Sequence, residues 1–98
     1  MNIQHLMKQA QSMQKKIQEE TAKLEQTDFE GKSGGESVKI VMTGKRVVKK
    51  LILDDELLKD KETLEDLLIV AINDVNGKIE KAINDSTNNA TGGIKLPF

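Results

Sequence analysis

The chain has 98 residues, a net charge of −1 and no cysteine. This length allows one domain with a small core. The lack of cysteine excludes disulfides and thiolate metal sites. Only Phe29 and Phe98 are aromatic, so stacking on unpaired bases is a poor fit. We expect self-association to add stability to such a small core.

The apolar segments are short. None approaches the roughly 20 apolar residues of a membrane span. The first residues lead directly into a polar, periodic segment instead of the apolar run of a signal peptide. We therefore expect a cytoplasmic protein that makes no membrane contact.

Charge is unevenly distributed along the chain. Residues 1–26 carry four lysines against three glutamates, and residues 27–53 carry six basic side chains against three acidic ones. Residues 54–98 carry five basic and ten acidic side chains. A basic face is therefore compatible with the nearly neutral total.

Residues 2–26 are predicted to form one long amphipathic helix. Apolar residues recur every seven positions, with others in the seam between them, and no glycine or proline interrupts the segment. This coiled-coil-like stripe needs a partner, most simply the same helix of a second subunit. It comprises Ile3, Leu6, Ala10, Met13, Ile17 and Leu24.

Residues 27–54 are predicted to form a three-stranded antiparallel meander. Residues 27–33 form a weak strand before a Gly34-Gly35 turn, and two stronger strands flank Gly44-Lys45. A single helical layer covers one sheet face, so the remaining apolar surface is exposed or meets a second subunit. Candidates for this dimer interface are Val38, Ile40, Met42, Leu51 and Leu53.

The acidic segment that follows Leu53 is expected to be a short turn or helical stub. A second long helix is predicted over residues 61–85, with Asp60 as its N-cap. Gly77 lowers the helix propensity locally. Residues 86–98 are expected to be a flexible tail. The result is a single α+β domain, residues 1–98, with the order α-β-β-β-α.

Catalytic and metal-binding constellations are missing. Gly31-Lys32-Ser33 resembles the end of a phosphate-binding loop but lacks the upstream glycine and the following helix. His5, the only histidine, has no predicted nucleophile or orienting group. The acidic residues from Asp54 to Asp60 lack the spacing of a calcium loop. We expect no enzyme activity, metal, cofactor or small-molecule substrate.

Several motifs resemble the YbaB/EbfC family of nucleoid-associated proteins. The opening helix of that family reads L-M-K-Q-A-Q-x-M-Q-x-K-M, and this chain has Leu6-Met7-Lys8-Gln9-Ala10-Gln11-Ser12-Met13-Gln14-Lys15-Lys16-Ile17. Further matches follow in the same order and span nearly the whole chain. They are Val38-Lys39-Ile40, Leu53-Asp54 with Leu57-Leu58, Leu64-Glu65-Asp66-Leu67, Ala71-Ile72-Asn73-Asp74 and Lys95-Leu96-Pro97-Phe98.

The resemblance implies a tweezers-like homodimer with projecting first helices, located in the nucleoid, that binds double-stranded DNA and influences gene expression or recombinational repair. Because Arg46 is the only arginine, we expect contacts to phosphates more than to bases. The expected DNA-binding residues are Lys8, Lys15, Lys16, Lys23, Lys78 and Lys81. A secondary basic patch comprises Lys45, Arg46, Lys49 and Lys50.

Two alternatives remain at this point. The coiled-coil-like stripe also suits a protein–protein interaction module that serves recombination, repair or replication proteins. A preference for duplex RNA over DNA is a further alternative. For each single lysine, an ordinary solvated surface charge is an equally good interpretation.

Overall fold

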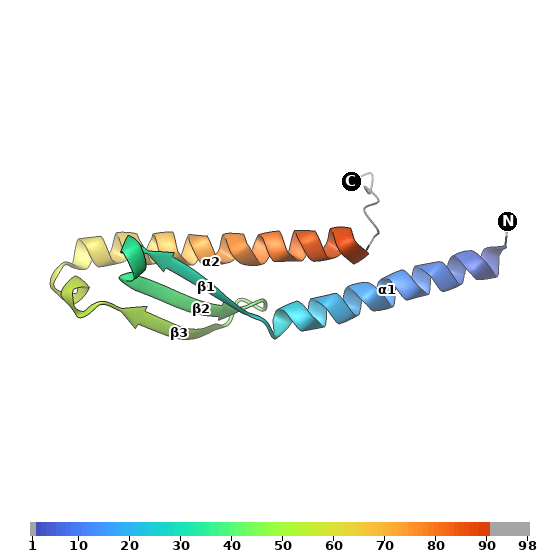
Figure 1. Cartoon of the computed structure of the whole chain (residues 1–98), viewed down its shortest axis with the longest axis horizontal. Helices are drawn as coiled ribbons and strands as arrows, with labels where there is room; N and C mark the ends of the chain where they lie inside the picture. Colours follow the sequence, from blue (N-terminus) through green and yellow to red (C-terminus); the bar gives the residue numbers. More distant parts are fainter. Residues whose placement is uncertain (1, 91–98) are drawn as a thin grey trace.

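The computed structural model describes residues 2–90, with side chains up to residue 87. The chain forms two long helices and a three-stranded sheet that lies between them in the sequence, and Figure 1 shows their arrangement. The predicted α+β class and the order α-β-β-β-α are confirmed. The elements are α1 (Ile3–Glu25), β1 (Asp28–Ser33), η1 (Gly34–Glu36), β2 (Val38–Thr43), β3 (Val48–Leu53), η2 (Asp55–Lys59) and α2 (Lys61–Ala90), where η denotes a short 3-10 helix.

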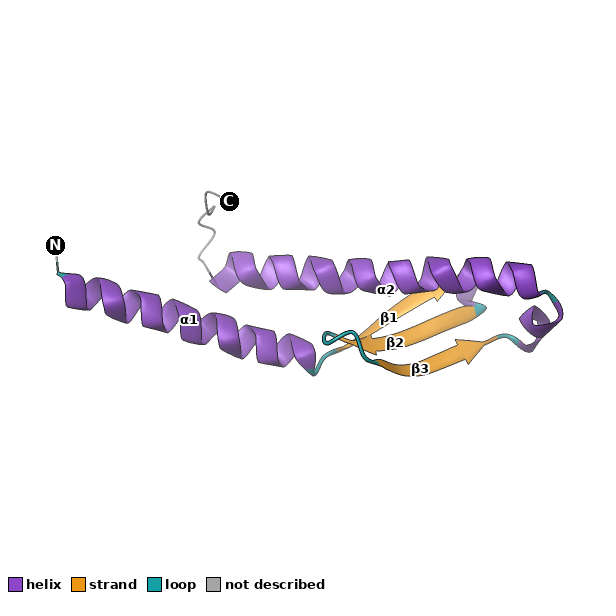
Figure 2. Ribbon diagram, turned by 180° about the vertical axis from the view of Figure 1, so that it is seen from behind, coloured by secondary structure: helices purple, strands orange, loops and turns teal. Residues whose placement is uncertain are grey.

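Helix α1 extends away from the sheet and has no buried residue (Figures 1 and 2). Its start is capped by Asn2, whose Oδ1 accepts a 3.0 Å hydrogen bond from the Gln4 N–H. The projection makes the molecule elongated, with extents of 69 × 24 × 16 Å and a radius of gyration of 18.9 Å. A compact chain of this length would have a radius of about 13 Å.

The sheet is an antiparallel meander in the order β1-β2-β3. Gly34 and Gly35 turn the chain between the first two strands with φ values of 59° and 72°, a region that glycine adopts without steric cost. Strand β3 begins at Val48, whereas a strand that directly follows the expected Gly44-Lys45 turn would begin at Arg46. The reason is that Arg46 has a φ of 70° and belongs to the turn.

The core is one layer of side chains between β2 and α2. Ala71, Val75 and Ile79 of α2 pack against apolar residues of β2. Val38, Ile40 and Met42, expected at a dimer interface, are only 0, 3 and 6% exposed, because α2 of the same chain covers them in this core. Strand alternation identifies an apolar face but does not say whether the chain's own helix or a second subunit covers it.

Helix α2 covers β1 and β2 and leaves β3 largely uncovered (Figure 2). Leu51 lies opposite Ile40 in the register, so both side chains belong to the core face of the sheet. Leu51 is nevertheless 49% exposed, whereas Leu53 is half-buried against the core. The core face of the sheet therefore continues beyond the helix as an open apolar surface.

Helix α2 begins as predicted and ends later. The Asp60 carboxylate accepts hydrogen bonds from the Thr63 N–H at 3.2 Å and from the Thr63 hydroxyl at 2.7 Å. The expected end at residue 85 is wrong, because α2 continues to Ala90. The added turn contacts α1, where the Ser86 hydroxyl donates to Glu20 Oε2 at 3.5 Å. The rest of the expected tail, residues 91–98, lies outside the described residues.

Candidate nucleic-acid interface

Four lysines occupy one face of α1. Positions 15 and 16 are adjacent, and each differs from positions 8 and 23 by seven or eight residues, which is about two helical turns, so the four side chains share one side of the helix. All four residues are exposed, and none has a carboxylate partner within residues 2–90. We call Lys8, Lys15, Lys16 and Lys23 the lysine face.

The other charges of α1 leave this face mostly basic. Residues 3–18 contain no aspartate or glutamate. Of the three glutamates that follow, Glu20 accepts the hydrogen bond from Ser86, and Glu25 Oε2 lies 4.0 Å from Lys45 Nζ. Only Glu19 falls among the lysines by helical position. The amino-terminal part of α1 is therefore positively charged without internal neutralisation.

The two lysines expected on α2 differ from one another. Lys78 Nζ donates to the Glu30 carbonyl oxygen at 2.8 Å and lies 3.3 Å from Asp74 Oδ2. This amine therefore ties α2 to β1. Lys81 is exposed and has no ion pair among the described side chains. Lys81 is therefore more available for contact with a phosphate than Lys78.

The same carboxylate, Asp74, also holds strand β1. Its Oδ2 accepts a 3.0 Å hydrogen bond from the Lys32 backbone N–H. This bond lowers the pKa of the Asp74 carboxyl below its ordinary value, desolvation opposes the shift, and Lys78 adds a further lowering. Asp74 and Lys78 together form a link between α2 and β1.

The secondary basic patch near the β2–β3 turn is largely neutralised. Arg46 Nη2 lies 3.0 Å from Glu80 Oε2, and Lys49 Nζ lies 3.2 Å from Asp28 Oδ2. Lys45 is paired with Glu25, while Lys50 has no ion pair in the described part of the chain. The partners Asn76 and Glu80 are 30 and 34 residues from Arg46, and no sequence signal indicated them.

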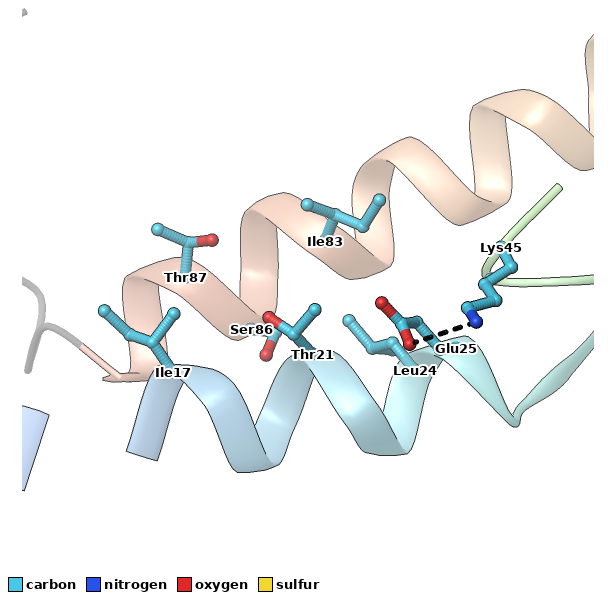
Figure 3. A pocket seen from close by; sticks show the side chains of 9 residues that line it. Ile17, Thr21, Leu24, Glu25, Lys45, Ile83, Ser86 and Thr87 are labelled. Carbon is cyan, nitrogen blue, oxygen red and sulfur yellow. Dashed lines mark ion pairs between the residues drawn. The ribbon is translucent and has the colours of Figure 1, made fainter. Parts of the chain in front are cut away.

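A pocket of about 190 Å³ lies where α1 and α2 approach each other (Figure 3). Ile17 and Leu24 line it from α1, and Ile83 lines it from α2. The dashed line in Figure 3 marks the ion pair between Glu25 and Lys45 at its rim. Its surface is mainly apolar and belongs to the packing of the two helices.

The residues considered for catalysis or metal binding lie apart. His5 Nε2 is 3.3 Å from Gln9 Nε2 on α1, and Asp54 accepts a 3.1 Å hydrogen bond from the Glu56 N–H at the start of η2. Within residues 2–90, no three His, Cys, Asp or Glu side chains are grouped to hold a metal ion. No helix in that range is long and apolar enough to cross a membrane.

Comparison with known proteins identifies the family. A sequence profile of the YbaB/EbfC DNA-binding family matches residues 1–94. The chain belongs to this family. The resemblance detected in the opening helix is thereby confirmed, and the family consists of nucleoid-associated DNA-binding proteins.

Relatives in this family match over almost their full length. A nucleoid-associated protein of Rickettsia prowazekii is 45% identical, over 98% of this chain and 92% of the relative. One of Rickettsia typhi is 44% identical with the same coverage. The crystal structure of an uncharacterized protein from Helicobacter pylori superposes with a TM-score of 0.81 and 29% identity, covering 94% of this chain and 99% of that one.

Proposed function

We propose that this family member binds double-stranded DNA through phosphate contacts made by the lysine face of α1. The observation that carries the proposal is the segregation of α1, which places lysines without a carboxylate partner among the described residues on one side and apolar residues on the other. Because α1 extends beyond the sheet (Figure 1), the amino-terminal part of this face is open to a duplex.

Phosphate recognition fits the available side chains better than base readout. Bidentate recognition of guanine is the usual role of arginine in the major groove, and the single arginine is occupied by Glu80 and Asn76. Lysine is a flexible point charge suited to phosphates. We therefore expect weak sequence preference, a nucleoid location and an effect on DNA organisation, with gene expression or recombinational repair as downstream processes.

We propose further that the protein acts as a homodimer. The support is an apolar surface next to the uncovered strand, which we call the β3 surface and define by Val48, Leu51, Ile69 and Ile72. These residues are 53, 49, 58 and 39% exposed. Ile69 and Ile72 precede Asn76 along one stripe of α2, and Asn76 faces the β2–β3 turn through Arg46. A second copy would bury this surface and place two lysine faces on one particle.

The decisive experiment is a gel-shift titration on random duplex DNA at several salt concentrations. Affinity should fall by about 0.9 in log units per log unit of salt for each phosphate contacted. The double variant Lys15→Glu/Lys16→Glu should lose most of its binding and show a shallower salt slope. Lys59→Glu/Lys61→Glu is the matched control, because it makes the same charge change at the opposite end of the fold.

Two results would contradict this proposal. Binding that stays constant between low and moderate salt is incompatible with phosphate contacts. If both double variants lost affinity for duplex DNA equally, binding would depend on the net charge of the protein and not on a defined interface. Competition with duplex RNA in the same titration tests the nucleic-acid preference.

The exposed apolar side of α1 supports a second candidate function, a module that binds recombination, repair or replication proteins. Ile3 and Leu6 are 71 and 45% exposed there. Charge reversal of Lys15 and Lys16 separates the two functions, because it alters the lysine face and leaves the apolar side intact. If this variant loses DNA binding but still forms a complex with such a protein, the complex depends on the apolar side of α1. This result would favour the second function.

A further inference from the structure

Helix α1 carries the lysine face, yet its side chains contribute little to fixing its direction. None of its residues is buried. Where α1 approaches α2, a pocket of about 190 Å³ lies between them, lined by Ile17 and Leu24 on one side and by Ile83 on the other (Figure 3). Two helices that enclose such a space hold one another less firmly than helices in a filled core. Contacts at the carboxyl end of α1 therefore have the larger part in setting its direction.

The β2–β3 turn, residues 44–47, lies directly against this carboxyl end. The Gly44 N–H donates a 3.2 Å hydrogen bond to the Thr27 carbonyl oxygen. A Cβ at Gly44 would collide with the Leu24 carbonyl oxygen and lie 2.6 Å from the Leu24 carbonyl carbon. The backbone of the turn therefore touches the backbone of the last helical turn, and only glycine leaves room for this contact.

Further hydrogen bonds hold the end of α1 to the residue that accepts from Gly44. The Thr27 N–H donates to the Leu24 carbonyl oxygen at 3.1 Å, and the Thr27 hydroxyl donates to the Lys23 carbonyl oxygen at 2.7 Å. Both acceptors lie in the last turn of α1, where regular helical partners are missing. Because Thr27 also accepts the bond from Gly44, the end of the helix and the β2–β3 turn form one hydrogen-bonded unit.

The β2–β3 turn is also fastened to α2. The Arg46 guanidinium donates to Asn76 and pairs with Glu80, both on α2. On the side of α1, Lys45 Nζ lies 4.0 Å from Glu25 Oε2. Three consecutive residues of the turn therefore connect the carboxyl end of α1 to the middle of α2.

A small rotation at this end becomes a large displacement at the other. Helix α1 has 23 residues and is therefore about 34 Å long. A rotation of about 10° at Thr27 moves Lys8 by about 5 Å and Lys23 by only about 1 Å. Successive phosphates of one DNA strand are about 3.4 Å apart along the duplex axis. Such a rotation would therefore move Lys8 past its phosphate and leave Lys23 in place.

We propose that Gly44 is a positioning residue for DNA binding. By letting the β2–β3 turn contact the backbone of α1, it fixes the direction of the helix and thereby the position of Lys8 near the far end. This inference rests on the proposed contact between the lysine face and DNA phosphates. Gly44 acts through α1 and does not itself contact the duplex.

The direction of α1 can be measured without DNA. Because the chain has no cysteine, Gln11→Cys on α1 and Asn73→Cys on α2 provide two exposed sites for spin labels. Labelled chains are mixed with an excess of unlabelled chains, so that double electron–electron resonance reports distances within one chain. Gly44→Ala should shift or broaden the distance distribution, by up to about 4 Å for a rotation of about 10°.

Gly35→Ala is the matched control for this measurement. Gly35 has a φ of 72°, so alanine is strained there as well, but the residue lies in the connection between β1 and β2, at the opposite end of β2 from Gly44. This variant should lose stability and keep the parent distance. An equal change of distance in Gly35→Ala would overturn the proposal.

Arg46→Ala keeps the proposal testable if Gly44→Ala does not fold. It releases the β2–β3 turn from α2 without inserting an atom between the turn and α1, and it should broaden the same distance distribution. An unchanged distribution in Arg46→Ala, or in folded Gly44→Ala, would overturn the proposal.

A second measurement separates position from stability. In the unmodified background, Lys8→Ala and Lys23→Ala should each lower the salt slope of duplex binding by about 0.9. In the Gly44→Ala background, Lys23→Ala should still lower the slope, whereas Lys8→Ala should have little further effect, because Lys8 no longer meets its phosphate. A general loss of stability would not distinguish the two lysines.

Two outcomes of the salt titration have different meanings. Equal effects of the two lysine substitutions in the Gly44→Ala background would overturn the positioning role of Gly44. If neither substitution changed the slope in the unmodified background, the proposed phosphate contacts would be wrong, and the positioning role in DNA binding would fall with them. The spin-label distances would then still decide whether Gly44 fixes the direction of α1.

Discussion

Arg46 Nη2 and Glu80 Oε2 lie 3.0 Å apart and connect the β2–β3 turn to the outer part of α2. The same guanidinium donates to Asn76 Oδ1 at 2.6 Å. The backbone of Arg46 has a positive φ of 70°, and residues other than glycine rarely adopt this region. The only arginine of a DNA-binding chain therefore has a structural role in holding the turn against the helix.

The first prediction concerns this contact. Arg46→Ala should lower the free energy of unfolding by about 1 kcal/mol, because it removes one partly exposed ion pair and the hydrogen bond to Asn76. Its affinity for DNA should change less than that of Lys15→Glu/Lys16→Glu. Lys50→Ala, which removes a neighbouring unpaired cation, should change stability by less than about 0.5 kcal/mol. Urea denaturation compares the two, and a larger loss in Lys50→Ala would contradict this role.

The second prediction concerns the close approach of α2 to β1. A Cβ at Gly31 would collide with the Ala71 carbonyl oxygen and lie 2.7 Å from the Val75 Cβ. Gly31→Ala should therefore push the helix off the strand and cost about 3 kcal/mol. Thermal and urea denaturation measure the loss.

Gly77 provides the matched control for that substitution. A Cβ there would meet no other atom within 4 Å, and the residue lies inside α2. Gly77→Ala should stabilise the protein by about 0.5 to 1 kcal/mol through its higher helix propensity. If both substitutions destabilised equally, the steric explanation for Gly31 would be wrong.

The third prediction concerns acid stability. The Lys32 N–H lowers the pKa of Asp74 in the folded state, so the ionised carboxylate favours folding. This contribution is fully present above the pKa of the unfolded chain, near 4. It is lost as the pH falls through the lower folded pKa. Asp74→Asn should therefore flatten the loss of stability with pH below about 4.

Asp66→Asn is the control for the acid effect. Asp66 is an exposed α2 carboxylate without a partner in the described part of the chain. Denaturation midpoints at neutral and acidic pH should separate the two variants. If Asp66→Asn flattened the pH dependence as strongly as Asp74→Asn, the hydrogen bond from Lys32 would not be the cause.

The fourth prediction tests the proposed homodimer. Leu51→Lys places a charge in the centre of the β3 surface and should convert the dimer to monomer in analytical ultracentrifugation, because burying an unpaired charge is costly. Val70→Lys is the control, since Val70 is also exposed at 53% but lies on the outer side of α2. A dimer that persists in Leu51→Lys would exclude the β3 surface as the interface.

The order and type of the elements could be predicted from the sequence because they depend on local periodicity. Heptad spacing in residues 3–24 predicted α1, alternation from Val38 to Met42 predicted β2, and Asp60 was the expected N-cap of α2. These patterns involve residues only a few positions apart. The family was also evident from a contiguous segment, residues 6–17.

Only the tertiary structure decided what covers each apolar face. Strand alternation predicts an exposed apolar face at Val38, Ile40 and Met42, yet α2 of the same chain buries them, while β3 is left open. Helix α2 also continues through a polar segment of low helix propensity to Ala90, and Ser86 in this segment contacts Glu20 of α1.

For the charged residues, too, the sequence determined one part and the tertiary structure decided the other. The sequence by itself determined that the lysines of α1 share one face, because helical spacing alone places them there. It did not reveal that Arg46 and Lys49 are paired with carboxylates, or that Lys78 donates to the Glu30 carbonyl oxygen, since these partners lie on other elements and are far away in sequence. The packing of distant elements determines which cations are neutralised. Only the folded structure therefore shows that the lysine face of α1 has no carboxylate partner among the described residues.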